Sequence, residues 1–437
     1  MDLIIKWTAY WIYAIAVFFF INYLNIFYSI STLIDYLGSN FENGQFFDYV
    51  IVGAGSAGIT LAAKLADAGH KVVIIEAGGP APPFADIPVL ASLFQLSNYD
   101  WQYKTTSQKH ACKALINNQS RWPMGKILGG SSRLNYMAYV EGHPQDYQWF
   151  ADYKSYKLNG IKVISDLPVG QNLVDHILTG IDLVVLEKKL SVSVPELLKL
   201  TSGLNYFFNK QGPWTSAGIE VVGTLAEKNK PDLQFMVFAE YFAPLAFKTA
   251  VTIAPVLLHP KSTGEVKLKT ADPSDDLEIN PNYLSHPDDI SILIKGLKLV
   301  SKLVNTGAMK TLGASLYTRP FPGCEGIKFG TDNYWRCYVQ QLTLTSYHPA
   351  GTCKLGSVVD NSFRILGTKN LFVVDASILP SLPSGNINAA VMMIASKAAD
   401  LINKSMSELN QTRNYFCRKS NYVSDIFNLP NVCLKSA

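Results

Sequence analysis

The sequence has few charged residues and no extended region of one charge sign. Lys, Arg, Asp and Glu make up 16% of its 437 residues, against about 25% in an average soluble domain, while hydrophobic residues make up 48%. This composition excludes a disordered chain, because it allows a large buried core. Most of the net charge of +4 lies in residues 403–437. The rest is nearly neutral and lacks the basic stripe of a nucleic-acid-binding protein, so no nucleic-acid partner is expected.

Cysteine is also scarce. The chain holds six cysteines and no C-x-x-C pair, so we expect no metal site. The cysteines that lie close in sequence are Cys324 with Cys337 and Cys417 with Cys433. At most one or two disulfides are expected, which would suit an oxidising compartment.

An uncharged stretch follows Lys6 and runs from Trp7 to Ile34, with its most apolar part at Ala9–Ile21. The apolar core of a secretory signal has about 7–15 residues, whereas a membrane-spanning helix needs roughly 20. We therefore expect residues 1–34 to be a signal peptide and the protein to be secreted. The alternative is an uncleaved membrane anchor, because no small-x-small cleavage site is evident.

A glycine-rich turn joins an apparent strand to an apparent helix. The β-branched run Phe47–Val52 leads into Gly53-Ala-Gly55-Ser-Ala-Gly58, and a helical pattern continues over Ile59–Ala66. In such a turn the first glycine permits the tight bend, the second lets a pyrophosphate approach the backbone, and the third allows close helix packing. The free N–H groups of the helix would then face the phosphates.

A second strand is expected at Lys71–Ile75, and Glu76 follows it directly. A carboxylate at this distance from the glycines can accept hydrogen bonds from the ribose hydroxyls of an adenosine. The strand, turn, helix and acid together supply the context that the glycine motif requires. They predict a dinucleotide-binding fold but do not decide between NAD and FAD.

Further motifs carry a family resemblance. They are Gly125-Lys-Ile-Leu-Gly-Gly-Ser-Ser132, Arg133-Leu-Asn-Tyr-Met-Ala-Tyr-Val140, Asp166-Leu-Pro-Val-Gly-Gln-Asn-Leu-Val-Asp-His176, Tyr347-His-Pro-Ala-Gly-Thr-Cys-Lys354 and Ser384-Gly-Asn-Ile-Asn-Ala389. With the first glycine motif, this series resembles the glucose-methanol-choline (GMC) family of flavin oxidoreductases, in particular its animal members similar to FAD-dependent glucose dehydrogenase.

The resemblance implies an α/β fold in which a Rossmann-like FAD-binding domain carries an α+β substrate domain built on an antiparallel sheet. The FAD-binding domain would be assembled from separated parts of the chain. The expected division is residues 35–150 for its first part, 151–180 for a truncated junction that returns to it, 181–345 for the substrate domain, 346–402 for the closing part with the catalytic residues, and 403–437 for a polar tail.

The resemblance also implies which residues bind FAD. Those expected at the pyrophosphate and adenosine are Gly53, Gly55, Ser56, Ala57, Glu76 and Ala77. Those expected at or near the flavin are Trp101, Ser131, Asn135, Tyr136, Met137, Ala138, Asp375, Ala376 and Ile387, with Asp375 following an expected strand at residues 370–374. Met124 departs from the arginine that is usual in the family, which removes one positive donor near the cofactor.

His348 is the expected catalytic base, because a neutral imidazole can take the hydroxyl proton of an alcohol. Asn386 stands where the family has a second histidine or an asparagine, and its amide could hold the substrate oxygen; the alternative for Asn386 is an ordinary helix N-cap. His176 is expected to be a structural hydrogen-bond donor. The implied substrate is a small alcohol or sugar such as glucose, and the implied electron acceptor is a quinone or oxygen.

One stretch departs from the family. Only residues 148–165 separate Tyr147 from Asp166, where family members have a much longer segment that carries a central strand of the cofactor sheet. An internal deletion of this kind would leave apolar strand edges and helix faces without partners. The alternative function is therefore a catalytically impaired or inactive truncated member that acts as a non-enzymatic protein.

Overall fold

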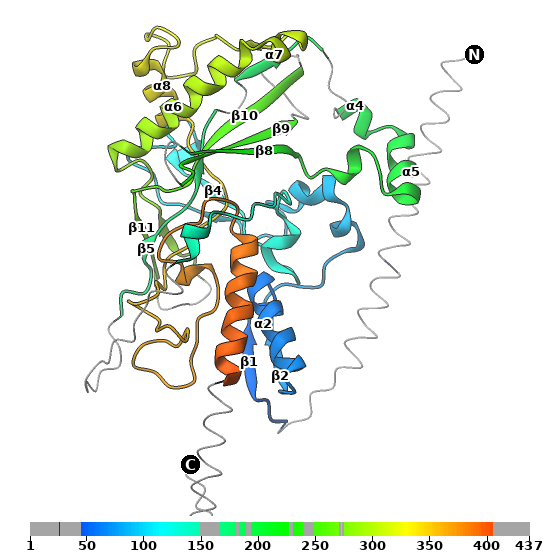
Figure 1. The fold of residues 1–437 in the computed structure, drawn as a ribbon, viewed down its shortest axis with the longest axis vertical. Helices are drawn as coiled ribbons and strands as arrows, with labels where there is room; N and C mark the ends of the chain where they lie inside the picture. The colour runs from blue at the N-terminus through cyan, green and yellow to red at the C-terminus, as the bar shows by residue number, and fades with distance from the viewer. Residues whose placement is uncertain are drawn as a thin grey trace, which may run out of the picture.

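A computed structural model describes residues 26, 45–148, 167–180, 183–188, 194–226, 230–239, 249–270, 272 and 275–404. Apart from Ile26, the expected signal or anchor lies outside the described residues. Residues 149–166, which include the first part of the shortened junction, and the tail beyond residue 404 with Cys417 and Cys433 also lie outside them. Within the described ranges, no helix has both the length and the apolar character needed to cross a membrane. Figure 1 shows an elongated molecule in which an antiparallel sheet with its helices lies above a smaller α/β unit.

The smaller unit begins with the predicted strand, turn, helix and strand. These are β1 (Tyr49–Val52), α2 (Ser56–Asp67) and β2 (Val72–Ile75). The two strands are parallel, with Tyr49 opposite Val72 and Val52 opposite Ile75. Gly69 ends the helix region with a φ of +88°, a left-handed conformation that glycine adopts at little cost. The local sequence pattern was therefore sufficient to predict this unit.

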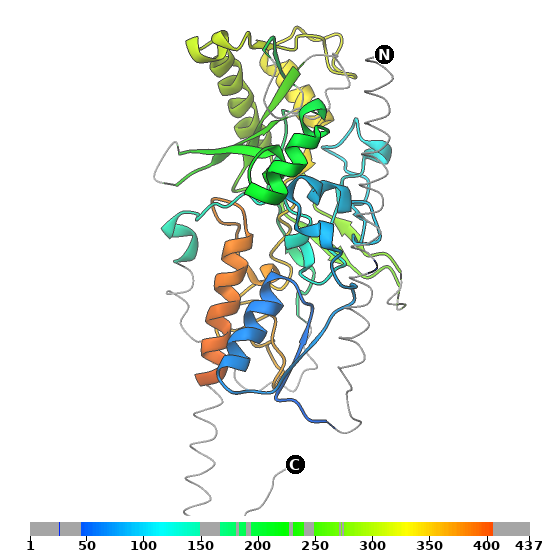
Figure 2. The same cartoon turned by 90° about the vertical axis from the view of Figure 1, so that its right-hand side faces the viewer.

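The C-terminal helix, residues 388–404, lies beside α2 in both views (Figures 1 and 2). Lys64 Nζ lies 3.3 Å from Asp400 Oδ1 across this contact. Between the two helices and β1, the side chains of Leu65, Ile394 and Ile51 are buried in one hydrophobic cluster. Burial of this cluster joins the beginning of the described chain to its end.

A seven-stranded antiparallel sheet forms the larger unit. Its strands run in the order β13-β7-β10-β6-β14, with β9 paired to β10 and β8 to β9. Their bounds are β6 Ile177–Leu178, β7 Val184–Leu186, β8 Ile219–Leu225, β9 Leu233–Ala239, β10 Thr249–Leu257, β13 Ser315–Leu316 and β14 Leu344–Thr345. The structure thus confirms the predicted α/β fold with an antiparallel sheet.

Helices cover one face of this sheet. They are α6 (Pro287–Val304), α7 (Gly307–Thr311) and α8 (Asp332–Gln341). Leu293 and Leu297 of α6 are fully buried against the sheet. Cys324 and Cys337, one of the two pairs that lie close in sequence, form a disulfide with their Cα atoms 6.0 Å apart, which ties the loop before α8 to that helix.

Smaller elements complete the described chain. They are α4 Val194–Leu197, α5 Leu200–Asn209, the strand pair β3 Tyr103–Lys104 and β4 Arg121–Trp122, the sheet of β5 Gln171–Leu173, β11 Gly264–Lys267 and β12 Glu278–Asn280, and the 3-10 helices η1 Pro83–Asp86, η2 Pro88–Phe94, η3 Ile116–Asn118, η4 Gly130–Arg133, η5 Pro144–Tyr147, η6 Pro213–Thr215 and η7 Ala376–Ile378.

The strand predicted at residues 370–374 is not formed, which corrects that expectation. Phe372 makes only an isolated antiparallel bridge with Arg364. A parallel strand needs a neighbouring strand to accept its hydrogen bonds, and the described parallel sheet consists of β1 and β2 alone. The chain at residues 370–374 therefore pairs locally instead of extending the sheet.

One face of the β1–β2 pair is uncovered by the described residues. The side chains of Val50, Val52 and Ile75 are 60%, 83% and 55% exposed, whereas Ile51 on the opposite face is 8% exposed. Parallel sheets are normally buried on both faces. The exposed valines agree with the prediction that the shortened junction leaves apolar strand surface without a partner.

Candidate active site

The first glycine motif forms a tight loop, here called the phosphate loop (residues 53–58). A Cβ atom at Gly58 would lie 2.0 Å from the carbonyl oxygen of Gly53, so only glycine fits there. A Cβ at Gly53 would meet nothing within 4 Å, and one at Gly55 would meet only the Gly130 Cα atom at 3.9 Å. The loop is thus tight toward its own helix and open on its outer side, where a pyrophosphate would approach.

The second glycine loop (residues 125–132) packs directly on the phosphate loop. The Gly129 N–H donates to the Ala54 carbonyl at 2.9 Å. A Cβ at Gly130 would lie 2.8 Å from the Gly55 Cα atom. The two loops therefore contact each other backbone to backbone, which explains why position 130 needs glycine.

Glu76 is fixed at the end of β2, beside the phosphate loop. Its Oε2 atom accepts a hydrogen bond from the Ala54 N–H at 2.6 Å, and its Oε1 atom accepts one from the Gly78 N–H at 2.7 Å. Each carboxylate oxygen keeps a further lone pair for a ribose hydroxyl. Ala77 follows it on the exposed surface. This arrangement fits the adenosine role predicted for Glu76.

Ser56 and Ala57 begin helix α2 and face different surroundings. The Ser56 hydroxyl donates to Asn388 Oδ1 at 2.7 Å, which links the phosphate loop to the first turn of the C-terminal helix. Ala57 packs against the hydrophobic cluster beneath the loop. Their N–H groups belong to the first turn of α2, which is the anion-binding end of a helix.

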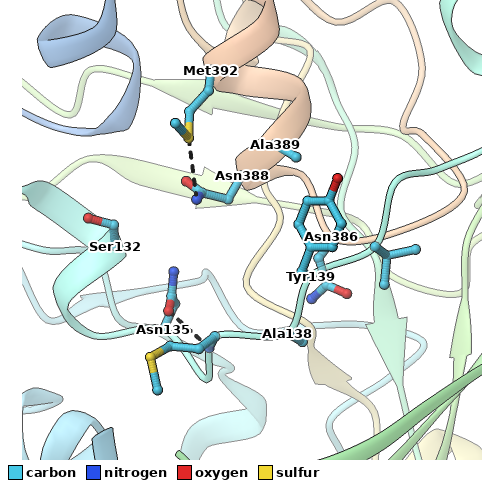
Figure 3. Close-up of a pocket in the computed structure, with 10 residues that line it drawn as sticks. Ser132, Asn135, Ala138, Tyr139, Asn386, Asn388, Ala389 and Met392 are labelled. Atoms are coloured by element: carbon cyan, nitrogen blue, oxygen red, sulfur yellow. Dashed lines mark hydrogen bonds between the residues drawn. The ribbon is translucent and has the colours of Figure 1, made fainter. Parts of the chain in front are cut away.

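A cavity of about 330 Å³ opens between the second glycine loop and the start of the C-terminal helix (Figure 3). The predicted residues Asn135, Met137, Ala138 and Asn386 line it. The residues that sequence reasoning missed in its lining are Ser132, Tyr139, Val140, Asn388, Ala389 and Met392. Because a helix N-terminus carries a positive partial charge, this cavity favours a ligand that becomes anionic.

Other predicted flavin residues lie outside this lining. Ser131 Oγ accepts a hydrogen bond from the Gly125 N–H at 3.1 Å and so shapes the second glycine loop. Tyr136 is partly buried and packs against Phe238 and Tyr347, toward the antiparallel sheet. For Ser131 and Tyr136 the structure therefore favours a supporting position over direct contact with the cavity.

Trp101, Asp375, Ala376 and Ile387 also lie outside the cavity lining. The Trp101 ring is stacked 6.0 Å from Tyr103. Asp375 Oδ1 accepts a hydrogen bond from the Ser377 N–H at 2.8 Å and thereby begins η7, in which Ala376 is the first residue. Ala376 and Ile387 pack against the hydrophobic cluster between β1 and the two long helices. The predicted contacts of these four residues with a cofactor stay predictions.

His348 is placed by a bulge between two antiparallel segments. Ile177 pairs with Thr345 and Val174 pairs with Ala350, so residues 175–176 of one segment lie opposite the longer stretch 346–349 of the other. Such a bulge re-aims the side chains within it. Tyr347, which has a φ of +64°, turns the chain so that His348 meets His176 of the opposite segment.

Both ring nitrogens of His348 have partners. Its Nδ1 atom lies 2.9 Å from Nδ1 of His176, and its Nε2 atom lies 3.3 Å from Nδ2 of Asn386, which lines the cavity. Burial lowers the pKa of His348 to about 3, so its imidazole is neutral at pH 7. The structure thus brings together the two residues predicted to be catalytic, and the base-competent form of the histidine is the one present.

Asn386 does not cap the C-terminal helix. That helix begins at residue 388, and the side chain of Asn386 instead contacts His348 and Gln234. Gln234 Nε2 donates to Asn386 Oδ1 at 3.4 Å from strand β9. Gln234 was missed in the sequence, because its position in an apolar strand gives no signal of a polar contact.

A buried network supports the backbone of His348. Its N–H donates to Asp175 Oδ1 at 3.0 Å, and the Tyr283 hydroxyl donates to Asp175 Oδ2. The Trp122 indole N–H in turn donates to the Tyr283 oxygen at 3.0 Å. Burial raises the pKa of Asp175 to about 6, and the hydrogen bonds from Tyr283, Thr345 and His348 limit the rise.

The residues present fit the pyrophosphate and the flavin ring of FAD, and they fit its adenosine only in part. The open outer side of the phosphate loop fits a pyrophosphate, and the cavity beside Asn386 fits a planar ring at the lower end of the usual range of about 300–1,000 Å³. Glu76 is held where a ribose would bind. On the adenosine side, the open face of Val52 and Ile75 lacks a covering layer among the described residues.

Comparison with known proteins agrees with this geometry. Models of the GMC oxidoreductase family match residues 47–165 and 260–395, which together make up more than half of the chain. The chain is similar to glucose dehydrogenase [FAD, quinone] of Drosophila melanogaster, at 26% identity over 82% of this chain and 87% of that protein. It is also similar to the mitochondrial choline dehydrogenase of Homo sapiens, at 35% identity over 56% of this chain and 42% of that protein.

Solved structures show the same fold. Formate oxidase of Aspergillus oryzae matches with a TM-score of 0.72 and 21% identity over 84% of this chain and 100% of that one. Pyridoxine 4-oxidase from Mesorbium loti matches with a TM-score of 0.66 and 20% identity over 81% and 99%.

The alignment with the Drosophila melanogaster dehydrogenase spans 544 positions, more than the 437 residues of the chain, so that relative has more than a hundred residues with no counterpart here. The predicted internal shortening agrees with this difference. The family matches also confirm the predicted oxidoreductase class, and the relatives support FAD as its cofactor. Because the models match both ends of the described fold and the overall structure agrees, the chain belongs to the GMC oxidoreductase family.

Proposed function

We propose that this protein oxidises the CH–OH group of a small alcohol or sugar with FAD as cofactor, and that His348 is the base. The observation that carries the proposal is the contact of the His348 Nε2 atom with Asn386 at the wall of the cavity, 3.3 Å away. A buried and neutral imidazole at that point can accept a proton from a hydroxyl group.

The names of the relatives suggest the substrate class. They include a glucose dehydrogenase, an alcohol dehydrogenase [acceptor] of Pseudomonas putida and choline dehydrogenases. Each name refers to a substrate that carries an oxidisable hydroxyl group. By the same comparison, we propose a quinone or oxygen as the acceptor that takes the electrons away.

The residues divide the work as follows. The phosphate loop at Gly53 and Gly55 would hold the pyrophosphate, and Glu76 the adenosine ribose. The bound FAD would supply the acceptor for the hydride that leaves the carbinol carbon. Asn386 Nδ2 donates a hydrogen bond to the substrate oxygen, and His348 Nε2 removes its proton. Negative charge on that oxygen is thus stabilised by the Asn386 amide and by the protonated His348 imidazole.

A visible spectrum and a substrate panel test the proposal. The purified protein should show a flavin band near about 450 nm, and glucose, choline or a primary alcohol should bleach it without oxygen. His348→Ala should abolish bleaching and retain the band, while His110→Ala, which lies outside the cavity lining, should bleach normally. Bleaching at an unchanged rate in His348→Ala would remove His348 from the mechanism.

A second function is favoured by the open face of β1 and β2. A truncated member that folds without retaining FAD would be a non-enzymatic protein, and the exposed Val50 and Val52 are the observation in its favour. Absence of the flavin band from protein purified with added FAD would select this function.

For the location, we propose secretion directed by a signal peptide within residues 1–34, with an uncleaved membrane anchor as the alternative. The disulfide between Cys324 and Cys337 supports an oxidising compartment. Mass analysis of material from the culture medium distinguishes the two, because a cleaved signal shortens the N-terminus and an anchor retains the protein with membranes.

A further inference from the structure

A line of hydrogen-bonding groups runs from the antiparallel sheet through both proposed catalytic residues. It consists of the Gln234 amide, the Asn386 amide, the His348 imidazole and the His176 imidazole, with successive contacts of 3.4, 3.3 and 2.9 Å. Each contact needs one donor and one acceptor. Because each member donates at one of its two contacts and accepts at the other, all hydrogen bonds along the line run the same way. Only two overall directions are therefore possible.

In the first direction, Gln234 Nε2 donates to Asn386 Oδ1 and Asn386 Nδ2 donates to His348 Nε2. A neutral His348 then carries its proton on Nδ1 and donates it to His176 Nδ1. In the second direction both amides are reversed, His348 carries its proton on Nε2, and no lone pair remains there to accept a proton from a substrate.

The orientation of the two amides decides between the two directions, because Gln234 Nε2 faces Asn386 Oδ1 and Asn386 Nδ2 faces His348 Nε2. At the Gln234 end, one amide atom is buried without a hydrogen-bond partner whichever way the line runs. In the first direction this atom is Oε1. At the other end, His176 Nε2 is buried without a hydrogen-bond partner. Burial, then His348 and His259, lower the pKa of His176 and keep its imidazole neutral.

With the amides in this orientation, His348 Nε2 accepts a hydrogen bond from Asn386 Nδ2. The proton of a neutral His348 therefore lies on Nδ1, which faces His176 Nδ1 at 2.9 Å. His176 Nδ1 is then the acceptor and His348 Nδ1 the donor, which is the first direction.

We propose that His176 is a positioning residue that holds the proton of neutral His348 on Nδ1, so that the Nε2 lone pair faces Asn386, which lines the cavity. The importance of this tautomer for catalysis rests on the proposed function, but the tautomer itself does not. Asp175 complements it, because it anchors the His348 backbone at 3.0 Å. His176 thus has a specific role beyond that of a structural donor.

Long-range ¹H–¹⁵N spectra of protein labelled with ¹⁵N-histidine test the proposal, because they distinguish the two neutral tautomers. The resonances of His348 are those lost in His348→Asn. In the wild-type protein His348 should be protonated on Nδ1. In His176→Leu the buried Nδ1–H loses its acceptor, so the ratio of the Nδ1–H to the Nε2–H form should fall by about tenfold or more.

His176→Asn is the conservative control, because its side-chain oxygen can accept near the position of the lost Nδ1, and it should restore the wild-type tautomer. A wild-type His348 protonated on Nε2, or a ratio that is the same in His176→Leu and wild type, would overturn the proposal. The wild-type spectrum alone is decisive if His176→Leu does not fold. Absence of flavin or of substrate oxidation would refute the proposed function and leave this measurement unaffected.

Discussion

Ser384 donates two hydrogen bonds to Asp146, although 238 residues separate them in the sequence: the backbone N–H to Oδ2 at 2.7 Å and the hydroxyl to Oδ1 at 3.0 Å. Lys230 Nζ lies 2.7 Å from Oδ1 of the same carboxylate. Asp146 therefore joins the turn before Asn386 to the loop after the cavity lining and to the antiparallel sheet.

Asp146→Asn should destabilise the protein by about 2–3 kcal/mol, because Lys230 loses its buried counter-charge. Burial opposes ionisation of Asp146, but hydrogen bonds from Lys230, Ser384 and His143 outweigh it and hold the pKa of Asp146 below its usual value. Urea unfolding measures the change. Asp400→Asn, which breaks the exposed pair with Lys64, is the matched control and should cost at most about 1 kcal/mol. Equal losses in the two variants would contradict this account.

Gly58→Ala should remove FAD from the protein. Its Cβ atom would lie 2.0 Å from the Gly53 carbonyl oxygen, so helix α2 must move away from the phosphate loop. The flavin absorbance that remains with the protein after gel filtration measures retention. Gly307→Ala is the control, because a Cβ there meets nothing within 4 Å, and it should retain FAD fully. Full retention in Gly58→Ala would show that the loop does not hold the cofactor.

Local sequence was sufficient for the βαβ unit and insufficient for the surroundings of His348. Residues 47–76 carry their own strand, turn and helix signals, so the glycines and Glu76 could be placed from spacing alone. The contact of His348 with His176 depends on a bulge opposite a distant segment, which leaves no periodic signal. The prediction of a strand at residues 370–374 was wrong for a related reason, because a strand there requires a partner strand that the described chain does not provide.

The two faces of β1 should respond differently to substitution. Val52→Lys should change the free energy of unfolding by about 0.5 kcal/mol or less, because the Val52 side chain is 83% exposed. Ile51→Ala should cost about 2–4 kcal/mol, because Ile51 is 8% exposed and packs in the cluster under the helices. Chemical unfolding of both variants checks the pair. A large loss in Val52→Lys would show that another part of the protein covers this face.

Acid should destabilise the protein through the buried histidines. The native pKa of His348 is lowered to about 3 from 6.5, so between these values the unfolded chain takes up a proton that native His348 refuses. Stability then falls with falling pH, by about 1.4 kcal/mol per pH unit for each such group. Burial lowers the pKa of His176 in the same direction.

Asp175 changes the stability in the opposite direction as the pH falls, so its contribution to the acid response can be separated from that of His348. Its native pKa is raised to about 6 from 3.8, so between these values the native protein holds a proton that the unfolded chain has released, and stability rises as the pH falls. Relative to wild type, His348→Gln should therefore flatten the dependence of unfolding free energy on pH between about 4 and 6, and Asp175→Asn should steepen it, each by about 1.4 kcal/mol per unit. Urea unfolding across this range measures both slopes. Changes of the same sign in the two variants would show that burial does not shift the two groups in opposite senses.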